Sequence, residues 1–104
     1  MKTELKHTKG KWNVIQPVNQ NYLVVKSDDK VLHICEILKG TYTIDKTEAE
    51  ANAKLIAAAP EMLKYCIAAY TVLRDNKKFI PEDKQQTLSL FMESMERVIK
   101  KATE

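Results

Sequence analysis

The residue types best suited to holding a ligand are an amide, Asn52, and an aromatic ten residues before it, Tyr42. Asn52 is the only amide in a stripe of residues spaced alternately by four and three, which places side chains on one face of a helix. The stripe reads Asn52, Ile56, Ala59, Leu63, Cys66, Tyr70 and Leu73. An amide among apolar neighbours needs hydrogen-bond partners or costs about 1–3 kcal/mol. Backbone, another subunit or a ligand can supply those partners.

Tyr42 lies just before the predicted start of this helix, where unpaired backbone N–H groups and the helix dipole favour an anion. An aromatic face, a buried amide and a helix N-terminus together suit a purine nucleotide. Two structural alternatives stay open. Asn52 can pair with backbone or fix the register of the helix, and Tyr42 can be an ordinary strand aromatic.

Other residues add to the candidate binding set. Lys9 and Arg74 can meet phosphates, the first as a point charge and the second as a planar fork. Trp12 offers a stacking surface. The predicted ligand-binding residues are therefore Tyr42, Asn52, Lys9, Trp12 and Arg74.

The sequence gives little support to catalysis. The three serines lie in a turn and a terminal helix, without the strand-turn-helix context of an activated nucleophile. His33 alternates with apolar residues in a predicted strand, which is typical of a core histidine rather than a base. The chain has two glycines, too few for a glycine-rich phosphate loop, and its two cysteines lack metal-ligand spacing. We expect no enzyme activity, no metal and no cofactor.

Length and charge narrow the class of protein. The 104 residues predict one domain, and a net charge of +3 with interspersed signs does not favour duplex nucleic acid. The first 25 residues contain no continuous apolar run, and no stretch approaches the ~20 apolar residues of a membrane span. We therefore expect a cytoplasmic protein with free buried thiols, without a membrane partner.

Runs rich in β-branched and aromatic residues predict strands over residues 11–16, 22–26 and 31–38, with a short extended segment over 41–44. Trp12 and Val14 are expected on one face. In the longest strand, alternation places His33 and Cys35 on one face and Ile34 and Glu36 on the other. Both faces of that strand are largely apolar, which predicts that another subunit covers one of them.

Capping boxes begin the first helix at Thr47 or at Asp45, each followed by a glutamate three residues later. Pro60 either kinks this helix or ends it, and the in-phase stripe favours a kinked, continuous helix. Asn76 is a candidate left-handed cap, and Pro81 opens the last helix. The stripe expected on that last helix is Leu88, Phe91, Met95, Val98 and Ala102, widened by Met92 and Ile99.

These elements predict an α+β fold with a single domain over residues 1–104. Residues 1–10 form a partly flexible tail, and residues 11–44 form an antiparallel sheet of three or four strands. Residues 45–104 form two long antiparallel helices, the first kinked at Pro60, that pack on the sheet.

Two segments resemble a known group of proteins. Residues 7–12, HTKGKW, are similar to the H-T-x-G-x-W opening of many small phage and prophage proteins. Residues 48–63, EAEANAKLIAAAPEML, resemble their E-A-x-A-N-A-x-L-I-A-A-A-P-E-L-L signature. Together the two segments cover about a fifth of the chain.

Within this group the chain resembles the phage anti-Thoeris family (Thoeris anti-defence proteins of the first type). The resemblance implies a sheet followed by two helices, a homo-oligomer, and an activity in the host bacterial cytoplasm. Members sequester, intact, the cyclic ADP-ribose isomers made by TIR proteins, and some bind cyclic oligonucleotides. The family pocket uses the Asn of the helix motif and an aromatic about ten residues earlier, which implies Asn52 and Tyr42. Arginines are scarce, so no phosphate-contacting set is implied.

Two hypotheses follow. In the first, the protein is a sponge that binds a cyclic nucleotide signal without degrading it. In the second, it is a phage-encoded protein–protein interaction module with no nucleotide ligand, and both motifs are purely structural.

Overall fold

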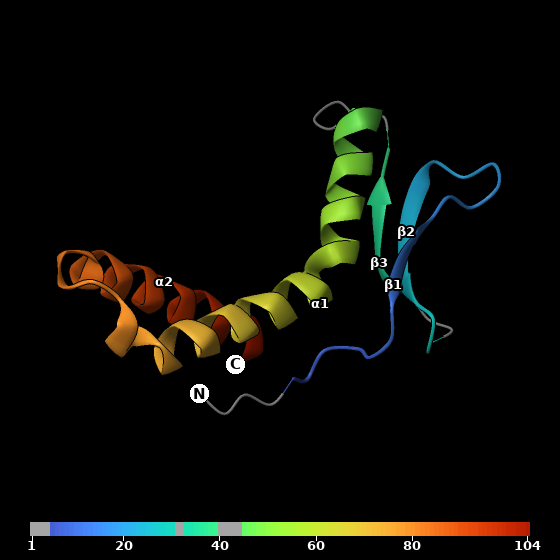
Figure 1. The fold of residues 1–104 in the computed structure, drawn as a ribbon. Helices are drawn as coiled ribbons and strands as arrows, with labels where there is room; N and C mark the ends of the chain where they lie inside the picture. The colour runs from blue at the N-terminus through green and yellow to red at the C-terminus, as the bar shows by residue number, and fades with distance from the viewer. Residues whose placement is uncertain (1–4, 31–32, 40–44) are drawn as a thin grey trace. The chain divides into compact units, whose positions relative to one another are not determined.

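The computed structural model describes residues 5–30, 33–39 and 45–104. Tyr42 and the predicted extended segment 41–44 lie outside these residues, as do the first two residues of the third predicted strand. The elements are β1 (Trp12–Ile15), β2 (Tyr22–Ser27), β3 (His33–Leu38), α1 (Lys46–Asp75), the 3₁₀ turns η1 (Lys77–Phe79) and η2 (Glu82–Lys84), and α2 (Gln85–Thr103). Figure 1 shows this order along the chain. The α+β class, with an antiparallel sheet before two helices, is confirmed.

The chain divides into two compact units. One is His7–Pro60, with the sheet and the first half of α1, and the other combines Met1–Lys6 with Glu61–Glu104. Helix α1 contributes to both, so a single domain over residues 1–104 stays a prediction. The core cluster of the sheet unit takes its helical residues from the first half of α1.

The core of the sheet unit lies between β2 and α1. Leu23 and Val25 share one face of β2 and pack with Ala49 and Ala53, and all four are buried. Alanine at these two helix positions lets the helix backbone approach the sheet closely, because no longer side chain intervenes. The partly buried residues around this cluster are Trp12, Ile34, Cys35, Ile37, Ile56 and Ala57.

A β-bulge in β3 changes the predicted alternation. Val25 pairs with Cys35 and Lys26 pairs with His33, so Ile34 is an extra residue without an opposite partner. Ile34 and Cys35 therefore both pack against the core. His33 and Glu36 face the other way, and their Nδ1 and Oε1 atoms are 2.9 Å apart. The predictions that Ile34 and Glu36 share a face and that His33 is a core histidine are wrong.

Helix α1 begins at Lys46 and is capped by Asp45. The Glu48 amide donates to Asp45 Oδ1 at 2.7 Å, which selects the earlier of the two predicted capping positions. The helix continues through Pro60, so continuity is confirmed and the alternative of two separate helices is wrong. The kink itself stays a prediction.

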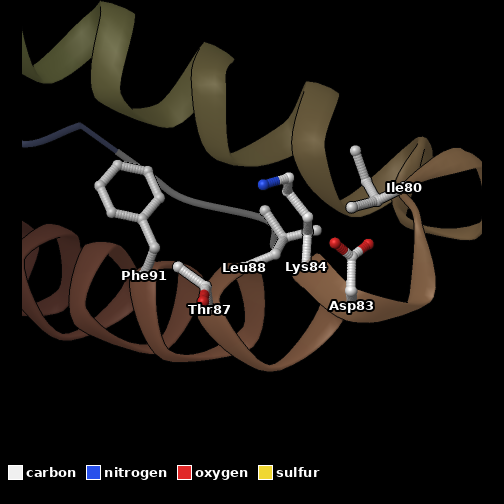
Figure 2. Close-up of a pocket in the computed structure, with 6 residues that line it drawn as sticks. All are labelled: Ile80, Asp83, Lys84, Thr87, Leu88 and Phe91. Atoms are coloured by element: carbon white, nitrogen blue, oxygen red, sulfur yellow. The ribbon is translucent and has the colours of Figure 1, made fainter.

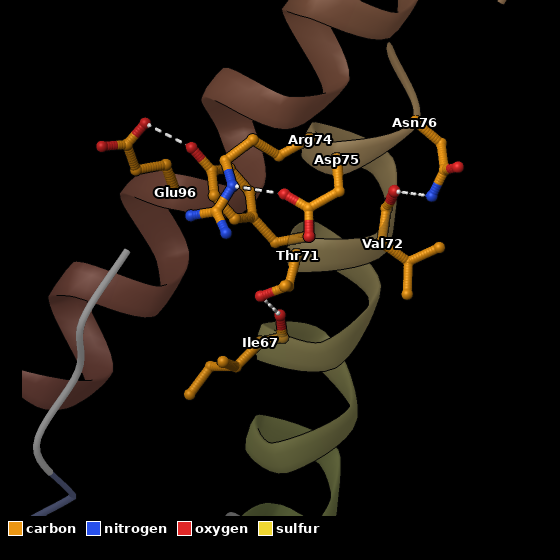
Figure 3. Close-up of polar contacts among 8 residues, drawn as sticks. Ile67, Thr71, Val72, Arg74, Asp75, Asn76 and Glu96 are labelled. Carbon is orange, nitrogen blue, oxygen red and sulfur yellow. Dashed lines mark hydrogen bonds and ion pairs between the residues drawn. The ribbon is translucent and has the colours of Figure 1, made fainter. Parts of the chain in front are cut away.

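In the unit Glu61–Glu104, the second half of α1 and helix α2 are joined by a hydrogen bond from Tyr70 Oη to Glu96 Oε2 at 3.2 Å (Figure 3). The buried residues of α2 are Met92 and Ile99, whereas Phe91 and Val98 are more than half exposed. The prediction centred the buried stripe of α2 on Phe91 and Val98, whereas the buried residues are the next ones along the chain, Met92 and Ile99.

The end of α1 also differs from the prediction. Asn76 has φ −111° rather than a left-handed conformation. Its side-chain Nδ2 instead donates to the Val72 carbonyl at 2.8 Å, a bond drawn in Figure 3. Pro81 precedes η2, and α2 proper begins at Gln85. The side-chain Nε2 of Gln85 stabilises the connection between α1 and α2 by donating to the Lys77 and Ile80 carbonyls, each at 2.8 Å.

Among the described residues, α1 is long and apolar enough to cross a membrane by length and composition alone. This corrects the expectation that no stretch comes near that criterion. The run of alanines from Ala49 to Ala59 supplies much of this apolar character. Length and composition do not assign the helix to a membrane, because helices of soluble proteins also meet them.

Candidate functional site

Asn52 lies on α1 beside the residues that contact the sheet. Ala49 and Ala53, on either side of it along the helix, have no exposed surface and belong to the core. Asn52 itself is half-buried. Its amide forms no hydrogen bond with any residue in the described ranges, whereas other side-chain amides such as Gln16 and Gln85 do. The side chain is thus partly shielded from water while keeping its polar groups available.

The N-terminus of α1 carries its own negative charge. Asp45 accepts the Glu48 amide, and the Ala49 amide donates to the Asp45 carbonyl at 3.0 Å. Glu48 adds a second carboxylate in the first turn. The negative charge of these two acids offsets the positive end of the helix dipole. The geometry therefore opposes the predicted role of this helix end in binding a phosphate.

Residues 7–12, HTKGKW, form hydrogen bonds and packing contacts within the sheet unit. Trp12 Nε1 donates to the Thr8 carbonyl at 3.0 Å, and the Trp12 ring packs against the core. The His7 ring meets it edge-on, with centroids 6.1 Å apart. The Lys9 carbonyl accepts a hydrogen bond from Ser27 Oγ. Trp12, a predicted ligand contact, therefore has a structural role, whereas the bond to Lys9 uses only its backbone carbonyl and leaves the predicted role of its ammonium group untested.

Gly10 lets the backbone of this stretch pass close to Ser27 and Asp29. Its φ of +92° is a conformation that side chains disfavour, and a Cβ added here would lie 2.6 Å from Ser27 Oγ and 2.7 Å from Asp29 Cγ. Ser27 is 1% exposed, and its Oγ also accepts the Asp29 amide at 3.1 Å. Ser27 thus joins the stretch before β1 to the turn after β2.

Sequence reasoning missed Ser27 as a structural residue. It was placed in a turn, because the segment Ser27-Asp28-Asp29 reads as a turn by composition. Composition carried no signal for this role, because the β1–β2 pairing that places Ser27 opposite Trp12, next to the stretch before β1, is visible only in the structure.

Replacing Ser27 with alanine is expected to lower the free energy of unfolding by about 1–3 kcal/mol, because the Lys9 carbonyl and the Asp29 amide both lose their partner. Urea denaturation followed by circular dichroism measures this. Ser94→Ala, at an exposed position of α2, is the matched control and should change the midpoint little. Equal midpoints for the Ser27→Ala variant and the parent would show that the hydroxyl is dispensable.

Arg74 is described with the other compact unit. Its Nε lies 3.2 Å from Asp75 Oδ1, and both side chains are exposed. Arg74 and Asn52 belong to different compact units, so a common site of the two stays a prediction.

A pocket of about 340 Å³ lies in the unit Glu61–Glu104, beside α2 (Figure 2). Its lining residues are Ile80, Asp83, Lys84, Thr87, Leu88 and Phe91. Most of the lining is hydrocarbon, with one carboxylate and one ammonium group. None of the predicted ligand-binding residues lines it.

Among the residues that the structure describes, the pKa values of Cys35 and Tyr70 are shifted. Burial raises the pKa of the Cys35 thiol, partly offset by a hydrogen bond with the Val25 backbone, so the thiol stays protonated at neutral pH and is a poor nucleophile. Desolvation first, and the Glu96 carboxylate second, raise the pKa of Tyr70. Within the described ranges, no cluster of three or more histidine, cysteine or acidic residues could hold a metal ion.

Comparison with known proteins places the chain at the level of a family. No curated protein and no solved structure matches it. A family model described as Salmonella phage P22 protein Y8K6 matches residues 1–104, the whole chain. This confirms the prediction of a phage protein, and the chain belongs to the family of Salmonella phage P22 protein Y8K6.

Proposed function

We propose that the protein is a phage immune-evasion sponge that binds a cyclic nucleotide signal and holds it without degrading it. The ligand class is the cyclic ADP-ribose isomers of TIR proteins, with cyclic oligonucleotides as a possible extension. The protein acts in the host bacterial cytoplasm as a homo-oligomer. It uses no metal and no cofactor.

The observation that carries this proposal is the state of Asn52. A half-buried amide beside a closely packed helix–sheet core has few water contacts to lose, and it has no hydrogen-bond partner among the described residues. Such an amide is well placed to hydrogen-bond a base edge, since the site would need little further desolvation. Membership of a phage family agrees with a role against host defence.

The binding set is narrower than the five residues predicted from sequence. The proposal keeps Asn52 and Tyr42 as the amide and the stacking ring. Trp12 is left out because its indole N–H and its ring serve the fold. Lys9 stays a candidate phosphate contact through its ammonium group, since Ser27 uses only its carbonyl. The acids at the start of α1 imply that the ligand's phosphates face away from that end of the helix.

A second candidate is a phage-encoded module that binds another protein and has no nucleotide ligand. The internal use of the HTKGKW stretch favours it, because one of the two shared motifs is explained by folding alone. Under this alternative Asn52 is also structural.

The discriminating experiment incubates the purified protein with a cyclic ADP-ribose isomer. Ultrafiltration followed by mass spectrometry then measures the free signal. The sponge should deplete the signal and release it chemically unchanged on heat denaturation. Heat-denatured protein is the control. No depletion at micromolar protein favours the interaction module, and recovery of a hydrolysed product in an activity-free preparation would indicate an enzyme.

A further inference from the structure

The pocket beside α2 has an apolar wall made by Ile80, Leu88 and Phe91. Figure 2 shows Phe91 at one end of the pocket and Ile80 at the other. Ile80 and Leu88 are half-buried, whereas Phe91 is 55% exposed, so a molecule bound here would remove more of its ring from water. A volume of about 340 Å³ lies within the range of small-molecule sites, about 300–1,000 Å³.

Two opposite charges also line this pocket, the carboxylate of Asp83 and the ammonium group of Lys84. Across residues 5–30, 33–39 and 45–104, neither group forms an ion pair, either with the other or with a third residue. Lys100, further along the same helix, is instead paired with Glu96 at 3.3 Å. Both charges in the pocket are therefore available to a ligand.

Neighbouring charges do not take the place of these two groups. The Lys78 Nζ atom lies over the Phe79 ring, 5.1 Å from its centroid. Lys77 and Glu82 are exposed and do not line the pocket. The charges that a ligand in the pocket meets are thus one carboxylate and one ammonium group.

The Thr87 hydroxyl adds a third polar group to the lining. Two other helical threonines of this unit, Thr71 and Thr103, donate their hydroxyls to the carbonyls four residues earlier, at 2.9 and 2.8 Å. The Thr87 hydroxyl makes no such bond within the described part of the chain. It can therefore donate to a ligand or accept from one.

We infer that this pocket binds the zwitterion of a free α-amino acid with an aromatic or large aliphatic side chain. The ligand carboxylate pairs with Lys84, its ammonium group pairs with Asp83, and its side chain lies against Leu88 and Phe91. A purely anionic ligand would meet the Asp83 carboxylate, and a purely cationic one would meet the Lys84 ammonium group, so a molecule with both charges fits best. This inference goes beyond the proposed function and does not depend on nucleotide binding.

Titration of the ¹⁵N-labelled full chain with L-phenylalanine, followed by NMR, tests the inference. The amide shifts of residues 80–91 should saturate with a dissociation constant of about 1–10 mM, as expected for a small ligand in an open pocket. Two analogues each lack one charge: phenethylamine has no carboxylate and 3-phenylpropanoate has no ammonium group. Each should bind up to about fivefold more weakly than L-phenylalanine, because one exposed ion pair is lost.

Exchange of the two charged residues assigns each contact. Lys84→Gln should bind L-phenylalanine and phenethylamine alike and still prefer L-phenylalanine to 3-phenylpropanoate. Asp83→Asn should show the converse. Phe91→Ala should weaken all three ligands about 2- to 12-fold through loss of the aromatic contact. Lys101→Gln, at an exposed lysine of α2 outside the pocket, is the matched control and should bind as the parent does.

Three results would each overturn the inference. The first is a set of shifts that does not saturate at ten times the expected dissociation constant. The second is equal affinity of the parent for all three ligands, since the pocket would then read neither charge. The third is a loss of affinity in Lys101→Gln as large as that in Lys84→Gln.

Discussion

Replacing Gly10 with alanine is expected to lower the free energy of unfolding by about 2–5 kcal/mol. Two costs add. Holding a residue with a Cβ at φ +92° costs about 1–2 kcal/mol, and forcing a methyl group to within 2.6–2.8 Å of Ser27 and Asp29 atoms costs about 1–3 kcal/mol. Ser27 cannot retreat freely, because it is buried and its hydroxyl bonds two backbone groups.

Thermal melting by circular dichroism measures this loss. At about 4–8 °C for each kcal/mol in a domain of this size, the midpoint should fall by at least about 8 °C. Lys11→Ala is the matched control, because Lys11 is the next residue and its side chain is exposed. Its carbonyl accepts a hydrogen bond from the Asp28 amide, and alanine keeps that carbonyl. If Gly10→Ala and Lys11→Ala melt at the same temperature, the close approach at Gly10 does not stabilise the fold.

Periodicity was enough to predict the elements. The run 22–26 became β2 with one added residue, and the helix beginning near Asp45 became α1. These segments were predictable because local capping chemistry and apolar spacing agree with the tertiary packing there. The α2 row was centred wrongly, because apolar residues occupy two adjacent faces of that helix and spacing alone does not say which face is buried.

The bulge at Ile34 was not predictable from sequence. Alternation assigns faces only while the register is regular, and one unpaired residue inverts every assignment beyond it. The structure, rather than the pattern, therefore places Glu36 beside His33 and removes His33 from the core.

The predicted ligand-binding residues show a second limit of sequence-based prediction. Residue type alone cannot tell whether an indole ring is already used by the fold. Trp12 was selected for its ring, yet that ring packs against the core and its N–H donates to the Thr8 carbonyl. Asn52 was selected by its place in an apolar stripe, and its lack of a partner among the described residues keeps it a candidate.

Asn52→Ala is expected to weaken binding of the cyclic nucleotide about 5- to 150-fold. The variant loses hydrogen bonds to a desolvated polar ligand, worth about 1–3 kcal/mol, and each 1.4 kcal/mol is tenfold. The free protein should melt no lower than the parent, because no described partner of Asn52 is lost and alanine favours a helix by up to about 0.7 kcal/mol over other ordinary residues. Tyr42→Ala should weaken binding similarly, since stacking on one base is worth about 1–3 kcal/mol.

Calorimetric titration of a cyclic ADP-ribose isomer into the parent, Asn52→Ala and Lys54→Ala, beside thermal melts of all three, tests the central claim most directly. Lys54 is an exposed neighbour on the same helix and serves as the control. The account predicts that the parent and Lys54→Ala bind alike, that Asn52→Ala binds about 5- to 150-fold more weakly, and that all three melt together. Normal binding by Asn52→Ala with a melting temperature well below the parent would contradict it and make the amide a structural group.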